Sequence, residues 1–344
     1  MPRRALVALL AIALLAGCGG QQPAAARTTV NTIASGLRVP WGVAFLPDGS
    51  ALVSERPTGR IVRIPRGGGR PRTVMRVPGV VADGEGGLLG LAVSPHYSSD
   101  RLVYAYLTTA GDNRIVRFRL GGSVHPILTG LQKASIHDGG RIAFGPDGKL
   151  YAGVGDAGNS SNAQNRSSRN GKILRIDPDG SIPSDNPFPG SPVWTFGHRN
   201  VQGLAWDSAG RLWATEFGQD TWDEINLIRK GRDYGWPVVE GKGSTHGGRF
   251  TNPLVTWHTD EASPSGAAIL RGSLYVGALA GQRLWKIPLH GASVGKPVAL
   301  LHGRYGRLRT VVAAPGGGLW VTTSNRDGRG SPRSGDDKVL LVRP

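Results

Sequence analysis

The chain has 344 residues and a formal net charge of +17, with 41 Lys and Arg against 24 Asp and Glu. Its arginines are spread along the sequence, and no helix-turn-helix, zinc-finger or RNP pattern occurs, so we expect no nucleic-acid partner. The single cysteine excludes an intramolecular disulfide.

The N-terminus has the features of an export signal. Two arginines precede an apolar stretch (5–16) that is too short to span a bilayer of roughly 30 Å. The segment LAGC (15–18) resembles the lipobox of bacterial lipoproteins, in which the cysteine is acylated; the alternative is an ordinary signal peptide with an accidental cysteine. We therefore predict a signal peptide (1–17), lipidation of Cys18 and a flexible tether (18–28). Such a chain would be exported and anchored to the outer face of the bacterial cell membrane.

The rest of the chain, residues 29–344, consists of repeats. Gly (53) and Pro (24) separate short β-branched and aromatic runs, which favours an all-β fold. Six segments each contain an apolar strand, a turn often of the Pro-Asp-Gly type, a second strand, a loop and a third strand. This pattern predicts a six-bladed β-propeller of four-stranded antiparallel blades. We expect TVNTIASGL (29–37) and KVLLV (338–342) to share one blade and close the ring.

Three polar stretches lead into the first strand of a repeat. They are SIHDGGR (135–141), GHRNVQG (197–203) and RLR (307–309). Because equivalent positions of a propeller point toward one end of its central channel, we expect these stretches to meet there. A histidine, carboxylates and arginines in one place are suited to binding an anionic cofactor and to moving a proton.

These stretches belong to a series of motifs that resembles the soluble glucose and aldose sugar dehydrogenases, which use pyrroloquinoline quinone (PQQ). The motifs follow one another as GEGGLLGLAVSPHY, HDGGR, GVGDAG, GKILRIDPDGSIPSDNPF, GHRNVQGLAWD, EFGQDTWDEINLI, YGWPVVEG and SPSGAAI. The resemblance covers nearly the whole chain after the tether, and the succession of GHRN, QGL, DEINLI and YGWP is its most specific part. It implies PQQ and Ca²⁺ as cofactors.

The resemblance also implies catalytic roles. His137 corresponds to the base that takes the proton from the anomeric hydroxyl of the sugar, and Asp156 to the carboxylate that orients this histidine. Arg199 and Asn200 correspond to residues that contact the quinone, with Arg199 placed to stabilise negative charge developing on its oxygens. By contrast, we expect Trp236 of the YGWP motif to be a core or blade-packing residue, and His198 to support its loop rather than react.

Further positions match cofactor-binding and metal-binding residues of the family. Arg307 and Arg309 correspond to arginines that pair with PQQ carboxylates. Gly218 and Gln219 correspond to two backbone carbonyls that hold Ca²⁺. Glu240 corresponds to a residue that offers its backbone carbonyl to a second, structural Ca²⁺.

Two positions depart from the family pattern. Glu85, a cofactor-contacting position, stands where the glucose enzymes have glutamine, and Ala280 stands where they have a cofactor-binding lysine. A carboxylate beside an acidic cofactor is unfavourable unless it is protonated or paired with an arginine. One lost cation and one gained anion weaken the case for tight PQQ binding.

The resemblance implies a quinoprotein that oxidises the C1 hydroxyl of an aldose to a lactone and passes electrons to an external acceptor. The sequence contains no Rossmann fingerprint, CxxCH haem site or iron–sulfur cysteine set that would identify the acceptor. Two alternatives stay open. One is a non-catalytic propeller that binds carbohydrate or a cell-wall partner, which Glu85 and Ala280 favour. The other is a propeller hydrolase, which the order of the motifs disfavours.

Overall fold

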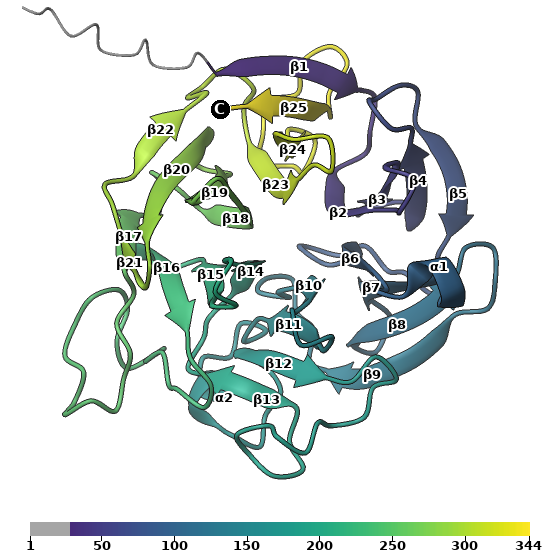
Figure 1. Cartoon of the computed structure of the whole chain (residues 1–344). Coiled ribbons are helices and arrows are strands. Elements are labelled where there is room, and N and C mark those ends of the chain that lie inside the picture. The colour runs from purple at the N-terminus through teal and green to yellow at the C-terminus, as the bar shows by residue number, and fades with distance from the viewer. Residues whose placement is uncertain (1–27) are drawn as a thin grey trace, which may run out of the picture.

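The fold is a ring of six antiparallel sheets around a central axis (Figure 1). The structure is a computed structural model, and it describes residues 28–344. The predicted signal peptide, Cys18 and nearly all of the tether therefore lie outside the described residues. The six-bladed, all-β prediction is confirmed, because each blade contains a path of four antiparallel strands.

In every blade the innermost strand comes first or nearly first in the chain. Blade 1 contains β2 (Pro40–Phe45), β3 (Ala51–Glu55), β4 (Arg60–Ile64) and β5 (Arg72–Arg76). Blade 2 contains β6 (Leu88–Val93), β7 (Leu102–Thr108), β8 (Asn113–Arg119) and β9 (His125–Leu131). Blade 3 contains β10 (Arg141–Phe144), β11 (Leu150–Val154), β12 (Lys172–Ile176) and β13 (Val193–Phe196).

The second half of the ring repeats this plan. Blade 4 contains β14 (Val201–Trp206), β15 (Leu212–Glu216), β16 (Trp222–Ile228) and β17 (Val255–His258). Blade 5 contains β18 (Pro264–Leu270), β19 (Ser273–Ala278), β20 (Arg283–His290), β21 (Ser293–Val294) and β22 (Val298–Leu300). Blade 6 contains β23 (Leu308–Ala313), β24 (Leu319–Thr323), β25 (Val339–Arg343) and the N-terminal β1 (Thr29–Ala34).

The first and last strands close the ring. β1 pairs antiparallel with β25, from Thr29 opposite Arg343 to Ala34 opposite Val339. This pairing confirms the expectation that the two ends of the described chain share a blade. It also covers the edge that a linear array of blades would leave open.

The hydrophobic core lies where neighbouring blades pack against each other. The described residues form six clusters of buried hydrophobic side chains, five of which join two neighbouring blades. The sixth joins blades 2 and 3 and also includes Trp41 of blade 1. The two helices, α1 (Tyr97–Asp100) and α2 (Ser161–Gln164), are single turns in connecting loops. Neither of these described helices has the length and apolar character needed to cross a membrane.

A β-bulge recurs near the channel. In five of the six inner strands, the register against the second strand shifts within the first few residues; these strands are β2, β6, β14, β18 and β23. A bulge places an extra residue in one strand and redirects its side chain. Trp41, Gln202 and Arg309 lie in these shifted segments, and all three border the channel cavity described next.

Candidate active site

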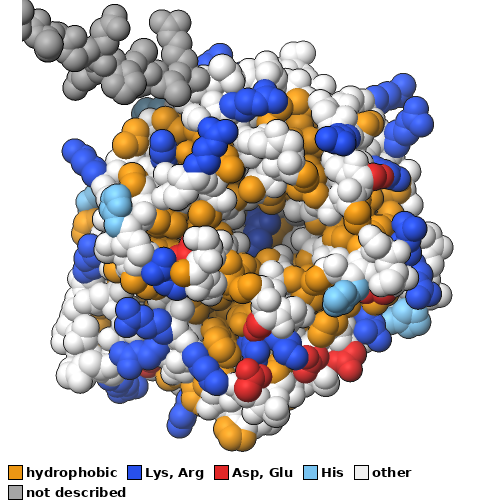
Figure 2. All heavy atoms as spheres, in the orientation of Figure 1, with side chains coloured by type: hydrophobic (Ala, Val, Ile, Leu, Met, Phe, Trp, Pro, Cys, Tyr) orange, Lys and Arg blue, Asp and Glu red, His pale blue; other side chains and the backbone are white. Residues whose placement is uncertain are grey.

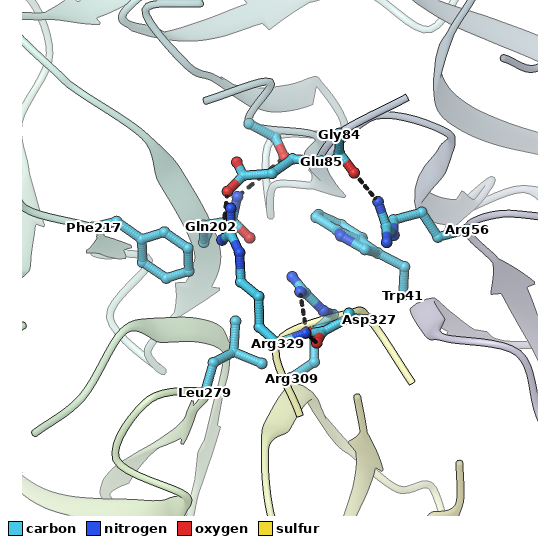
Figure 3. Close-up of a pocket in the computed structure, with 12 residues that line it drawn as sticks. Trp41, Arg56, Gly84, Glu85, Gln202, Phe217, Leu279, Arg309, Asp327 and Arg329 are labelled. Carbon is cyan, nitrogen blue, oxygen red and sulfur yellow. Dashed lines mark hydrogen bonds and ion pairs between the residues drawn. The ribbon is translucent and has the colours of Figure 1, made fainter. Parts of the chain in front are cut away.

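One end of the channel contains a cavity of about 260 Å³ (Figure 3). Its walls come from the inner strands, from the loops that precede them and from the loops that follow the second strand of several blades. The lining residues are Trp41, Arg56, Gly84, Glu85, Gly139, Gln202, Phe217, Leu279, Arg309, Asp327, Gly328 and Arg329. Three arginines and two carboxylates therefore border one small space.

His137 and Asp156 form a buried pair beside this cavity. His137 Nδ1 lies 2.7 Å from Asp156 Oδ1, and the two residues are 8% and 1% exposed. An ionised carboxylate only accepts hydrogen bonds, so in the neutral imidazole Nδ1 carries the proton and Nε2 has the lone pair. Asp156 also accepts hydrogen bonds from Trp236 Nε1 and the Gly158 backbone N–H, each at 2.9 Å. The histidine is thus held in the tautomer that a general base needs.

The local backbone explains why this pair forms. His137 has a left-handed conformation, with φ of 59°, which non-glycine residues adopt rarely and which is common at functional sites. The chain after β11 passes so close that a Cβ on Gly155 would lie 1.8 Å from the His137 carbonyl oxygen. Asp156 in turn donates its backbone N–H to the Arg199 carbonyl at 2.8 Å. The HDGGR, GVGDAG and GHRN motifs are therefore joined into one unit.

Glu85 connects this unit to the rim of the cavity. Its Oε2 accepts the His137 backbone N–H at 2.9 Å, and its Oε1 pairs with Arg329 Nη1 at 2.9 Å (Figure 3). The carboxylate that departs from the family pattern is therefore paired with an arginine. This is the condition under which an anion beside an acidic cofactor is tolerated.

Arg307 and Arg309 share one counter-ion. Asp327 Oδ2 lies 3.0 Å from Arg307 Nε and 3.5 Å from Arg309 Nη2. Burial alone would raise the pKa of Asp327, but the charges of Arg309 and Arg307 outweigh it and hold this pKa below its usual value. Of the two arginines, Arg309 borders the cavity, whereas Arg307 reaches it only through Asp327. Leu279, rather than its neighbour Ala280, borders the cavity from blade 5.

Arg199 and Asn200 lie in the loop between β13 and β14. Arg199 donates from Nε to Gln219 Oε1 at 3.0 Å and from Nη1 to the Phe217 carbonyl at 3.2 Å. Burial lowers the pKa of Arg199. The charges of nearby carboxylates, of which Asp156 has the largest effect, partly offset this lowering. Asn200 is fully buried, and its Nδ2 has no hydrogen-bond partner among the described residues. A buried donor without an acceptor is the feature expected where a ligand completes the site.

The predicted calcium carbonyls lie in the loop after β15. A Cβ on Gly218 would lie 1.9 Å from the Trp222 carbonyl oxygen, so only glycine permits this tight loop. Glu240 Oε1 accepts the backbone N–H groups of residues 219–222 at 2.7–3.2 Å and so holds the loop together. Residues 28–344 contain no cluster of three or more His, Cys, Asp or Glu side chains with metal-binding geometry. The predicted Ca²⁺ site would instead be formed by main-chain carbonyl oxygens.

Two expectations about neighbouring residues had different outcomes. Trp236, expected to be a core or blade-packing residue, is not in the core, because its indole is half-buried and donates to Asp156. The ring also lies under Arg199, whose guanidinium carbon is 5.6 Å from the ring centroid. The fully buried His198, in contrast, supports its loop, with Nδ1 2.8 Å from Glu216 Oε2. Sequence reasoning also missed the cavity residues Arg56, Asp327 and Arg329, which no motif marks.

Comparison with known proteins agrees with this geometry. A family model described as Glucose / Sorbosone dehydrogenase matches residues 37–341. A PQQ-bound aldose sugar dehydrogenase from Streptomyces coelicolor is 52% identical and superposes with a TM-score of 0.88, covering 93% of this chain and 99% of that one. Quinoprotein glucose dehydrogenase B of Acinetobacter calcoaceticus is 35% identical over 262 residues, which are 64% of this chain and 55% of that protein. An aldose sugar dehydrogenase of Escherichia coli is 29% identical over 90% of this chain and 95% of its own length. The chain belongs to the glucose/sorbosone dehydrogenase family.

Proposed function

We propose that the protein is a quinoprotein oxidoreductase that oxidises the C1 hydroxyl of an aldose to a lactone, with PQQ as the hydride acceptor. The observation that carries this proposal is the buried contact between His137 and Asp156, 2.7 Å apart, beside a cavity bordered by three arginines. Family membership and the 52% identity to a PQQ-bound aldose sugar dehydrogenase support the same reaction.

The residues of the cavity fit an acidic quinone. Guanidinium groups bind carboxylates through paired N–H donors, and Arg56, Arg309 and Arg329 border the cavity. The unpartnered Nδ2 of Asn200 is a further donor that a bound group would satisfy. PQQ bound here would supply a quinone carbonyl that accepts a hydride.

The protein's own contribution begins with proton transfer. His137 Nε2 would take the proton of the C1 hydroxyl as the C1 hydride leaves, so that a C=O bond forms at C1. Asp156 keeps the imidazole in the correct tautomer and stabilises the imidazolium that results, and Trp236 fixes Asp156 in turn. Arg199 would stabilise negative charge that develops on the quinone oxygens.

The calcium sites are part of this proposal. The backbone carbonyls of Gly218 and Gln219 would hold one Ca²⁺, because a hard cation prefers oxygen ligands, and that ion would polarise the bound cofactor. The Glu240 carbonyl would contribute to a second, structural Ca²⁺. The Glu240 side chain supports the first site indirectly, since it holds the loop that contains both carbonyls.

We also propose that the reaction takes place outside the cytoplasm. Acylation of Cys18 would anchor the exported protein to the outer face of the bacterial cell membrane, and an external acceptor would receive the electrons. Replacing Cys18 by Ser should release the protein from the membrane fraction. If the variant stays membrane-associated, the lipid anchor is wrong and the basic surface becomes the explanation.

The experiment that tests the proposed reaction is reconstitution. The purified protein, mixed with PQQ and Ca²⁺, should reduce an artificial dye in the presence of aldoses, and calorimetry should detect cofactor binding. Omission of Ca²⁺ should lower the rate without unfolding the propeller. A protein that binds no PQQ would contradict the proposal and leave a non-catalytic propeller.

A further inference from the structure

The channel has a second cavity at its other end. Its volume is about 310 Å³, and its lining comes from the inner strands of all six blades. The lining residues are Val43, Ala44, Phe45, Leu91, Ala92, Val93, Arg141, Ile142, Ala143, Phe144, Leu204, Ala267, Val311 and Val312. Figure 2 shows a central hollow surrounded largely by hydrophobic side chains, with a Lys or Arg side chain at its floor. Only Arg141 of the lining residues is charged.

Arg141 lies between the two cavities and is only 8% exposed. Its Nε donates to the Gln202 carbonyl at 2.8 Å, and its Nη2 donates to Thr310 Oγ1 at 3.1 Å. Its guanidinium carbon lies 4.3 Å from the ring centroid of Trp41. Every one of these partners is neutral, and none of the hydrogen bonds uses Nη1.

This cation has no counter-charge within residues 28–344. No Asp or Glu there forms an ion pair with Arg141, whereas Arg309, on the inner strand of blade 6, has Asp327. Burial, together with the charge of Arg309, lowers the pKa of Arg141 to about 9, so it remains protonated at neutral pH. Because a buried charge without a partner is strongly unfavourable, such groups normally have a bound counter-ion.

We propose that a small monovalent anion of the chloride class binds in this second cavity and is held by Arg141. The Nη1 group supplies an unused N–H donor, and no acidic side chain of residues 28–344 lines the cavity to compete with an anion for it. A divalent oxyanion would need several more donors and positive charges than this cavity offers. The ligand is therefore singly charged and weakly hydrated.

Such an anion would stabilise the centre of the ring. Trp41, Arg141, Gln202 and Thr310 belong to blades 1, 3, 4 and 6, and Arg141 contacts the other three. A negative charge here would offset the repulsion between Arg141 and Arg309. The site does not depend on the proposed dehydrogenase activity, because it uses none of the residues assigned to PQQ or Ca²⁺.

Thermal unfolding and crystallography of the whole protein test this site without PQQ. At constant ionic strength, exchange of sodium gluconate for 0.1 M sodium chloride should raise the melting temperature by about 1 to 3 °C. Crystals grown in sodium bromide should have an anomalous peak within hydrogen-bond distance of Arg141 Nη1. If this exchange leaves the melting temperature unchanged, or if the crystals have no such peak, the proposal is wrong.

Three variants make the result specific. Arg141→Gln removes the charge and should abolish the chloride-dependent shift, whereas Arg175→Gln, which removes a buried arginine paired with Asp147 and Asp185, should retain it. Ala143→Leu fills the cavity beside Arg141 and should abolish the shift even if Arg141→Gln does not fold. A chloride response that survives in Ala143→Leu would contradict binding in this cavity.

Discussion

Asp156 accepts three hydrogen bonds, and each comes from a different kind of donor: the imidazole of His137, the indole of Trp236 and the backbone of Gly158. A carboxylate that accepts this many hydrogen bonds is held in one position. The residue that it orients, His137, also has its backbone N–H held by Glu85. At the scale of single residues, the site is therefore a connected network rather than a set of independent groups.

The indole of Trp236 is a positioning group within this network. Trp236→Phe keeps the ring under Arg199 but removes the donor to Asp156, so kcat should fall about tenfold with little change in PQQ affinity. The pH profile of kcat should also shift, because the basicity of His137 depends on Asp156. Trp194→Phe, a change in blade 3 away from the cavity, should leave both measurements unchanged. An unaltered kcat and pH profile in Trp236→Phe would show that the indole is only structural.

If PQQ binds in the cavity as proposed, the pair between Glu85 and Arg329 would compete with the cofactor for the arginine. Glu85→Gln keeps an acceptor for the His137 N–H and removes the negative charge, so PQQ should bind about three- to tenfold more tightly. Arg329→Gln should weaken binding by a similar factor. Calorimetric titration of the wild type and both variants measures these affinities. Equal affinities in all three proteins would mean that Arg329 does not contact the cofactor.

At the scale of elements, the motif GVGDAG depends on one glycine. A Cβ at position 155 would lie 1.8 Å from the carbonyl oxygen of His137, so Gly155→Ala forces β11 and the HDGGR loop apart. We expect the free energy of unfolding to fall by about 2 kcal/mol or more. Chemical denaturation measures this value, and Gly111→Ala is the matched control, because a Cβ there meets no atom within 4 Å. Equal losses in the two variants would show that the close approach does not matter.

The strands and their order could be predicted because each repeat contains its own turn signals and alternating strands. The His137–Asp156 pair could be predicted only through the family resemblance, since these residues are 19 apart in sequence and on different elements. Trp236 and Arg329 escaped prediction for a physical reason. They reach the site from loops 80 and 244 residues away from their partners Asp156 and Glu85, and nothing in their local sequence indicates such contacts.

At the scale of the whole molecule, closure of the ring brings distant loops to one channel. The pairing of β1 with β25 fixes blade 6 beside blade 1, and this places the loop of Asp327 and Arg329 against Arg56 and Glu85. The positive charge of the chain is distributed around this ring. On the face that Figure 2 shows, Lys and Arg side chains are scattered over the rim rather than gathered in one patch.

One buried acid should make the stability of the propeller depend on pH. Burial raises the pKa of Asp138 from 3.8 to about 6, in part opposed by the hydrogen bond from Asn113, and Asp138 Oδ2 has no partner in the described part of the chain. The folded protein holds this proton more tightly than the unfolded chain, so the free energy of unfolding falls as pH rises from about 4 to about 6.

Asp138→Asn should remove this loss. The free energy of unfolding of the variant, relative to that of the wild type, should rise by on the order of 2 kcal/mol between pH 4 and pH 6. Above that range the difference should stay constant. Denaturant unfolding at a series of pH values measures the difference. A difference in free energy of unfolding that does not change with pH would mean that Asp138 titrates normally in the folded protein.

The proposed reaction is tested most directly by a single turnover at His137. Wild-type protein loaded with PQQ and Ca²⁺ should change the absorbance of its bound cofactor rapidly when an aldose is added without an external acceptor. His137→Ala should bind PQQ with nearly the same affinity, and its cofactor should be reduced about a hundredfold or more slowly. Reduction at the wild-type rate in His137→Ala would contradict the assignment of His137 as the base.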